Sequence, residues 1–103
     1  MISKVIKRDY TTTDFKISKI SSAIYAAMKS VKTGSITEAN DISLRVLEKL
    51  NTLSQSTKYY TPTVEEIQDM VEAELMHSEF LSVAKSYILY RDEQKRKRKK
   101  KKH

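Results

Sequence analysis

The stretch VIKRDYTTTDFKISKI, Val5–Ile20, decides the fold because it contains two short strands and the start of a helix. Val5–Arg8 and Thr11–Phe15 are rich in β-branched residues and are separated by two residues, which predicts an antiparallel hairpin. From Ile17 onward the apolar residues recur every three or four positions, so the chain is expected to enter a helix there.

Four segments in all show this helical period, and each has one apolar face. The residues predicted to be buried are, helix by helix, Ile17, Ile20, Ile24, Met28 and Val31; Ala39, Ile42, Val46, Leu50 and Leu53; Ile67, Met70, Val71 and Leu75; Phe80, Val83, Ala84, Tyr87 and Ile88. We therefore predict a mainly α fold of the α+β type, a four-helix bundle capped by a small N-terminal β-hairpin.

Local signals predict where these helices begin and end. Gly34, the only glycine, is expected to end the first helix. Ser35 with Glu38, and Thr63 with Glu66, have the spacing of a capping box and open the second and third helices. Gln55–Lys58 is predicted to be a loop, His77-Ser78-Glu79 a turn, and the fourth helix to end near Arg91.

Charge divides the chain into two parts. The net charge is +7, but 95–102 is an unbroken run of eight Lys and Arg residues. Without this run, twelve basic residues face thirteen acidic ones, so the remainder is close to neutral. We expect one domain over 1–94 and a flexible basic tail over 95–103, since a run of like charges repels itself and stays solvated.

Several kinds of chemistry find no support in the sequence. There is no cysteine, and the two histidines are His77 and His103, so neither a thiol nucleophile nor a Cys/His metal site is predicted. A glycine-rich phosphate loop is absent, and no apolar run is long enough to span a membrane. The acidic residues of 65–72, together with Lys29 and Lys49, are expected on solvated helix faces. No catalytic residue is assigned.

The opening stretch also gathers cations. Lys7 and Arg8 alternate along the predicted strand, and Lys19 lies in the first turn of the following helix. The amino end of a helix has free amide groups and favours anions. A lysine from the strand and a lysine from the helix could therefore converge on one phosphate group, although scattered surface lysines would give the same pattern.

Three segments resemble one known family, the ATP-cone domain. The first is VIKRD at 5–9 followed by Phe15 and Lys19-Ile20, the second is PTVEEIQDMVE at 62–72, and the third is VAKSYILYR at 83–91. Their order and separations match the family over nearly the whole predicted domain. The resemblance implies a small regulatory module, found mostly in ribonucleotide reductases, that binds ATP or dATP between its β-cap and its helices.

The resemblance also implies site residues. The positions that match the family's nucleotide site are Val5, Lys7, Arg8, Thr13, Lys16, Lys19, Ile20 and either Thr63 or Val64. Thr13 and Lys16 fall where the family places residues near the base. The others match strand residues that line the nucleotide site, contacts at the first helix and, for Thr63 or Val64, a threonine at the third helix. Tyr10 departs from the family, which usually has glycine there, and Lys16 stands where Asp or Asn is common.

The resulting functional hypothesis is an allosteric ATP/dATP-binding regulatory domain of a cytoplasmic ribonucleotide reductase, without enzymatic activity of its own. It implies ATP or dATP, bound with magnesium, as ligand, and self-association or reductase subunits as partners. Nucleic acid and membranes are not expected partners. Two alternatives stay open: a nucleic-acid-binding helical module that acts through its basic tail, and a degenerate cone with a structural or oligomerisation role only.

Overall fold

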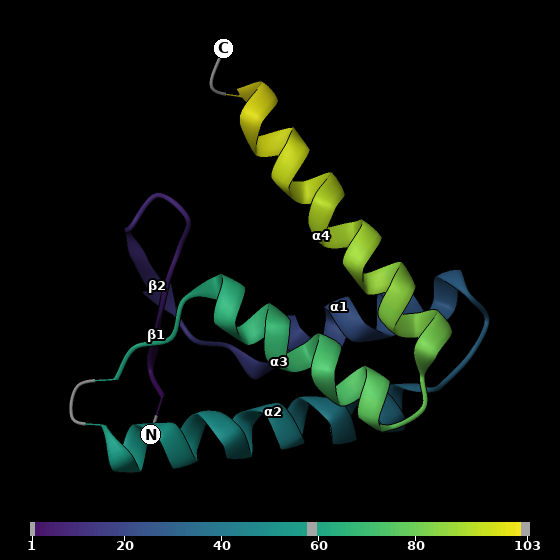
Figure 1. The fold of residues 1–103 in the computed structure, drawn as a ribbon, viewed down its shortest axis with the longest axis horizontal. Helices are drawn as coiled ribbons and strands as arrows, with labels where there is room; N and C mark the ends of the chain where they lie inside the picture. The colour runs from purple at the N-terminus through teal and green to yellow at the C-terminus, as the bar shows by residue number, and fades with distance from the viewer. Residues whose placement is uncertain (1, 58–59, 102–103) are drawn as a thin grey trace.

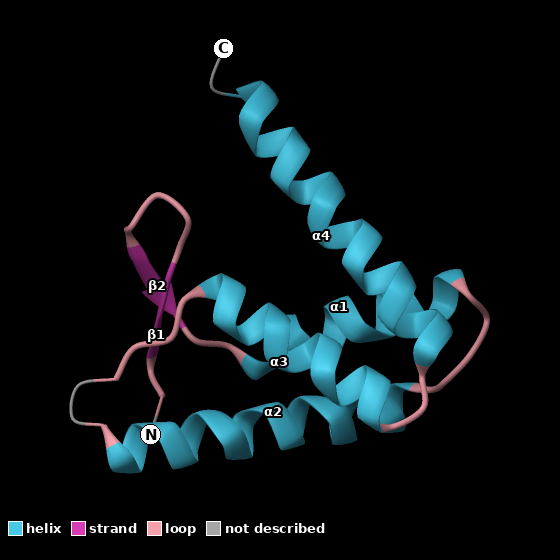
Figure 2. Cartoon of the chain, in the orientation of Figure 1, coloured by secondary structure: helices cyan, strands magenta, loops and turns pink. Residues whose placement is uncertain are grey.

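The computed structural model of the 103-residue chain describes residues 2–57 and 60–101. Two strands, β1 (Lys4–Ile6) and β2 (Thr12–Asp14), precede four helices, α1 (Ile17–Ser30), α2 (Ile36–Ser56), α3 (Val64–His77) and α4 (Leu81–Lys101). Each helix packs against its neighbours in the order α2, α1, α4, α3 and back to α2. The hairpin lies at one end of this bundle (Figures 1 and 2). The predicted fold class is confirmed.

The hairpin is short because its ends are fixed by contacts outside the strands. Val5 pairs with Thr13 in an antiparallel register, and the Lys7 N–H donates to the Thr11 carbonyl at 2.8 Å to close the loop. The Ile6 N–H donates to the Pro62 carbonyl at 2.9 Å, which ties the hairpin to the segment before α3. The strands are thus shorter than predicted, and the expectation that Lys7 and Arg8 alternate within a strand is wrong, because β1 ends at Ile6.

The core follows the apolar period of the helices. Ile24, Met28, Ile42, Leu50 and Leu75 are the largest fully buried side chains. Most of the predicted faces are confirmed, including Ala39 and Val46 on α2 and Val71 on α3. Leu53 is an exception, since it lies in the last turn of α2 beyond the packed part of the bundle and stays 38% exposed. Among the described helices, none has the length and apolar character needed to cross a bilayer.

The helix starts were predicted well by their caps. Thr63 and Glu66 form the full capping box at the start of α3, with both reciprocal bonds at 3.1 Å. At α2, the Ser35 hydroxyl accepts from the Glu38 N–H at 3.2 Å. Because these bonds use amide groups that would otherwise lack partners, the two starts are fixed locally.

The helix ends differ from the prediction. Gly34 does not end α1; Lys32 takes the left-handed position with φ of 54°, and the Thr33 N–H bonds to the Met28 carbonyl at 3.0 Å. Glu79, with φ of 66°, plays the same part after α3. The loop after α2 begins at Thr57, within the predicted Gln55–Lys58, and residues 58–59 lie outside the described ranges.

The fourth helix is longer than predicted. It runs past Arg91 to Lys101, so the boundary near Arg91 is wrong. Lys and Arg are good helix formers, and an i,i+4 pair between Glu93 and Lys97 at 3.6 Å supports the extension. The second half of α4 projects away from the bundle (Figure 1). Whether the domain ends at Gln94 stays a prediction.

Two of the three described non-glycine residues with positive φ, Lys32 and Glu79, lead to a stability prediction. Lys32→Gly and Glu79→Gly should each raise the free energy of unfolding by about 0.5–1 kcal/mol, because glycine removes the steric cost of a positive φ. The greater conformational entropy of glycine in the unfolded chain offsets part of this gain. Urea denaturation measures the change. Lys85→Gly is the matched control, since Lys85 is an exposed α4 residue, and it should lower stability by about 1 kcal/mol. A loss of stability in either variant at a left-handed position would contradict the prediction.

Candidate functional site

A cavity of about 270 Å³ lies where the hairpin meets the helices. Its lining comes from four places: both strands, the first turns of α1, the start of α3, and the middle of α4. The bond from Ile6 to Pro62 and an isolated parallel bridge between Ile6 and Thr63 hold the hairpin next to the start of α3. The sequence therefore builds this cavity by anchoring a hairpin on a bundle end.

Seven of the nine sequence-predicted positions line this one cavity. They are Val5, Lys7, Thr13, Lys16, Lys19, Ile20 and Val64. Val5 and Thr13 are directly paired across the hairpin, so their side chains lie on the same face of the sheet. The structure thus brings together residues that are nearly sixty positions apart in the sequence. That they contact a nucleotide stays a prediction.

The other two predicted residues are not part of the lining. Arg8 lies in the hairpin turn, where its guanidinium is 3.3 Å from the Glu65 carboxylate of α3. Thr63 uses its hydroxyl to cap α3, so Val64 is the one of the pair that faces the cavity. The capping role of Thr63 was predicted from its spacing to Glu66, whereas the pairing of Arg8 with the distant Glu65 was not.

Lys7, Lys16 and Lys19 give the cavity its charge. In the described part of the chain none of these three forms an ion pair, whereas Lys4 lies 2.5 Å from Asp14, whose pKa the hydrogen bond and charge of Lys4 lower. The other described ion pairs likewise leave the three cavity lysines out. Asp14 also lines the cavity, but its carboxylate is paired with Lys4, so the ammonium groups of Lys7, Lys16 and Lys19 leave the cavity with an excess of positive charge that favours an anionic ligand.

The start of α1 strengthens this charge. Its N-cap residue is Lys16, which makes no side-chain capping bond, and its first turn contains Lys19 and no acidic residue. The starts of α2 and α3, in contrast, each have a side-chain cap and at least one glutamate. The Lys19 N–H donates to the Lys16 carbonyl at 3.1 Å, but no side chain caps the amide groups before it, so the amino end of α1 favours an anion and the helix dipole adds to the lysine charges.

The opposite wall is neutral and largely apolar. The residues of this wall were not assigned to the site from the sequence. They are Phe15, Ala23, Ile67, Gln68, Tyr87 and Tyr90. Tyr87 is buried, and this burial raises the pKa of its hydroxyl, so the group stays neutral. A more open hollow of about 400 Å³ adjoins the cavity and shares Lys19, Ala23 and Tyr90 with it. For Tyr87 and Tyr90 the sequence offered their helical spacing, which also fits a core edge, and their place in the family-like segment 83–91, and neither assigned them to the site.

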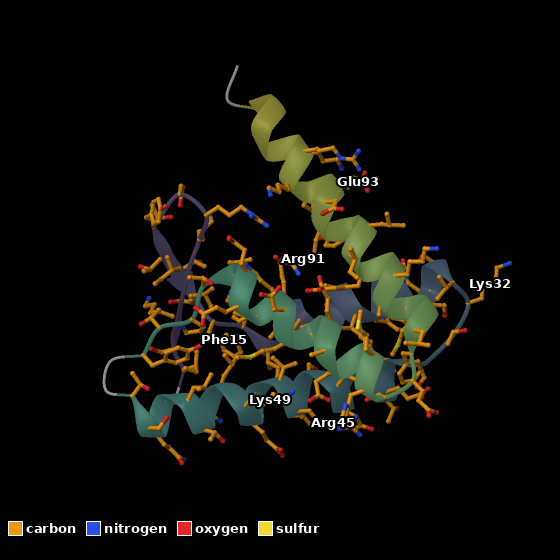
Figure 3. All side chains as sticks on the ribbon, viewed as in Figure 1. Phe15, Lys32, Arg45, Lys49, Arg91 and Glu93 are labelled. Atoms are coloured by element: carbon orange, nitrogen blue, oxygen red, sulfur yellow. The ribbon has the colours of Figure 1, made fainter. Side chains whose placement is uncertain are left out.

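Arg91 joins α3 to α4 beside this wall, one turn after Tyr87. Arg91, labelled in Figure 3, contacts the carboxylates of Glu72 and, at 3.1 Å, Asp69. Burial works against the charged guanidinium, but the hydrogen bonds to the two carboxylates outweigh it and raise the pKa of Arg91. The acidic residues of α3 are thus not a merely solvated face, since two of them hold α4.

Lys49 is also placed differently from the expectation. It was predicted on a solvated face, but its ammonium lies 2.7 Å from the buried carboxylate of Glu74. Lys29 is exposed and lies 5.2 Å from the centre of the Tyr25 ring. Lys49 therefore contributes to the packing of α2 on α3, because its loss would leave a buried carboxylate without its partner.

Comparison with known proteins identifies a matching domain family and two similar reductases. The ATP cone domain family matches residues 3–96. A vitamin B12-dependent ribonucleoside-diphosphate reductase of Thermoplasma acidophilum is 44% identical over 100 residues, covering 92% of this chain and 12% of that protein. A ribonucleoside-diphosphate reductase subunit alpha of Chlamydia pneumoniae is 35% identical over 104 residues, covering 94% of this chain and 10% of that protein.

This chain spans about a tenth of the length of these reductases, and the family match covers both strands and most of α4. The fold and the match agree with the resemblance seen in the opening stretch and in the two helical segments. The chain belongs to the ATP-cone domain family.

Proposed function

We propose that this chain is the adenine-nucleotide-sensing domain of a ribonucleotide reductase and that it binds ATP and dATP in the cavity between the hairpin and the helices. The observation that carries the proposal is that three lysines without ion-pair partners in the described structure line one cavity, Lys7 from the hairpin and Lys16 and Lys19 from the amino end of α1. The triphosphate faces this cationic wall, and the nucleoside faces the apolar wall formed by α3 and α4.

Magnesium enters this site with the nucleotide. Within the described ranges, no group of three or more His, Cys, Asp or Glu side chains could hold an ion by itself. Mg²⁺ is commonly held by substrate phosphates together with water and few protein ligands. The protein's part is then to supply the lysines that neutralise the remaining phosphate charge.

The regulatory effect proposed for the parent reductase is a change in subunit association. A ligand shifts an association equilibrium only as far as its affinity differs between the two states. ATP and dATP differ by one hydroxyl, so a difference in their effects requires a contact that depends on the sugar. No catalytic role is proposed for this chain.

Calorimetric titration of the chain with ATP and dATP tests the proposal directly. We expect saturable binding of both nucleotides at about 0.15 M salt, and light-scattering masses of the parent reductase that differ between ATP, dATP and no nucleotide. An absence of binding up to millimolar nucleotide would contradict the nucleotide site. Binding without any change in mass would contradict only the association effect.

A further inference from the structure

Gln68 has a buried polar atom without a partner. Its amide oxygen, Oε1, is shielded from solvent and accepts no hydrogen bond within the described part of the chain, although the side chain lines the cavity. The other such atom, on Asn51, belongs to α2 and does not line the cavity. An unsatisfied buried acceptor is destabilising, so a hydrogen-bond donor that reached this oxygen would be favoured there.

The position of Gln68 in the cavity limits what that donor can be. The three lysines come from the hairpin side and the start of α1, whereas the wall that contains Gln68 also contains Ile67 and Tyr87 and carries no charge. At neutral pH a triphosphate has oxygen atoms that accept hydrogen bonds, and these oxygens match ammonium groups. They do not match an amide oxygen, which itself only accepts.

The nucleoside has the missing donors. Adenosine carries an N6 amino group and sugar hydroxyls, and an amide side chain can accept from such a group with its oxygen while it donates with its NH₂. The terminal torsion of Gln68, χ3, has broad preferences. A rotation about it exchanges the positions of the amide oxygen and the NH₂ group and brings the oxygen into the cavity.

We infer, on the basis of the proposed function, that Gln68 recognises the nucleoside. Its amide oxygen accepts a hydrogen bond from a donor of the adenosine part of the ligand. The site then discriminates against nucleotides without that donor, because they cannot form this hydrogen bond with the Gln68 oxygen. This assigns Gln68 to specificity and the lysines to affinity for the phosphates.

Gln68→Met is the first test, since methionine keeps the length and helix propensity of glutamine and removes the amide. Calorimetry should show about a tenfold loss of ATP affinity, as expected for one hydrogen bond, and unchanged binding of inorganic tripolyphosphate. The melting temperature of the free protein should stay the same or rise, because the substitution removes a buried amide oxygen that has no hydrogen-bond partner in the described part of the chain. Gln55→Met, at an exposed α2 position, is the matched control and should change neither affinity.

Nucleotide analogues then identify the donor. Inosine triphosphate lacks the amino group, and 2′-deoxy- and 3′-deoxy-ATP each lack one hydroxyl. The analogue without the recognised donor should bind the wild-type chain about tenfold more weakly than ATP does, and should bind Gln68→Met as tightly as ATP does.

Three outcomes would overturn the inference: equal ATP affinity in wild type and Gln68→Met, an equal loss of tripolyphosphate binding, or no analogue whose deficit disappears in the variant. The second would place Gln68 at the phosphates. If the wild-type chain binds no ATP at all, the proposed function itself fails, which these titrations separate from a failure at Gln68 alone.

Discussion

Lys7→Ala and Lys19→Ala should each weaken ATP binding by about ten- to a hundredfold while leaving the fold intact. Each substitution removes a charge-assisted hydrogen bond to the triphosphate, which contributes about 1.5–3 kcal/mol. Neither lysine forms an ion pair in the described structure, and both are exposed, so their removal should cost little stability. Titration calorimetry gives the affinity, and thermal unfolding without nucleotide checks the fold.

The controls for this experiment follow from the structure. Lys85→Ala and Lys29→Ala each remove one positive charge from an exposed helix position that does not line the cavity, and both should leave ATP affinity nearly unchanged. Lys49→Ala is unsuitable as a control because Lys49 pairs with buried Glu74. Equal weakening by Lys7, Lys19, Lys29 and Lys85 substitutions would show that only the overall charge matters, and would contradict the assigned site.

Gly34→Ala should be the most destabilising change in the connection between α1 and α2. Gly34 has φ of 91°, and an added Cβ would lie 2.5 Å from the sulfur of Met28, which is fully buried. The left-handed backbone and the overpacked core together should lower the free energy of unfolding by about 2–4 kcal/mol. For a domain of this size that corresponds to a fall in Tm of roughly 4–8 °C per kcal/mol.

The neighbouring residue supplies the comparison for this prediction. Thr33→Ala, at an exposed position of the same loop, should change the stability by no more than about 0.5 kcal/mol. If Gly34→Ala were as harmless as Thr33→Ala, Met28 would have to move without cost, and the close packing of this loop on the core would not hold. Urea denaturation of both variants decides between these results.

Much of the fold could be predicted from the sequence because its determinants are local. The apolar periods of the helices and the Thr63 and Ser35 caps depend on residues three or four apart, and these predictions were confirmed. The ends of the strands and helices were harder to predict. Strand β1 stops where Ile6 bonds to Pro62, a partner far along the chain, and α1 stops at a left-handed lysine instead of the only glycine.

The site residues also divide into those predictable from local sequence motifs and those that depend on how the elements pack. Family resemblance identified seven residues that the structure brings to one cavity, since they lie in segments whose motifs are visible in the sequence. It did not identify Gln68 or Tyr90 as part of the lining, because which face of α3 and α4 borders the cavity depends on helix packing. Arg8 was expected at the site, but it pairs with Glu65 of α3, a residue far from the hairpin in the sequence.

The extended α4 has a mechanical consequence. Val83, Ala84 and Tyr87 hold its first half in the core, Tyr90 borders the cavity, and the helix continues unbroken to Lys101. At 1.5 Å per residue, the part beyond Tyr90 is about 16 Å long. If the helix tilted by about 10° at the cavity, this length would displace its far end by about 3 Å. A tilt of α4 at the cavity would therefore be amplified at its far end, where the sequence carries a dense positive charge.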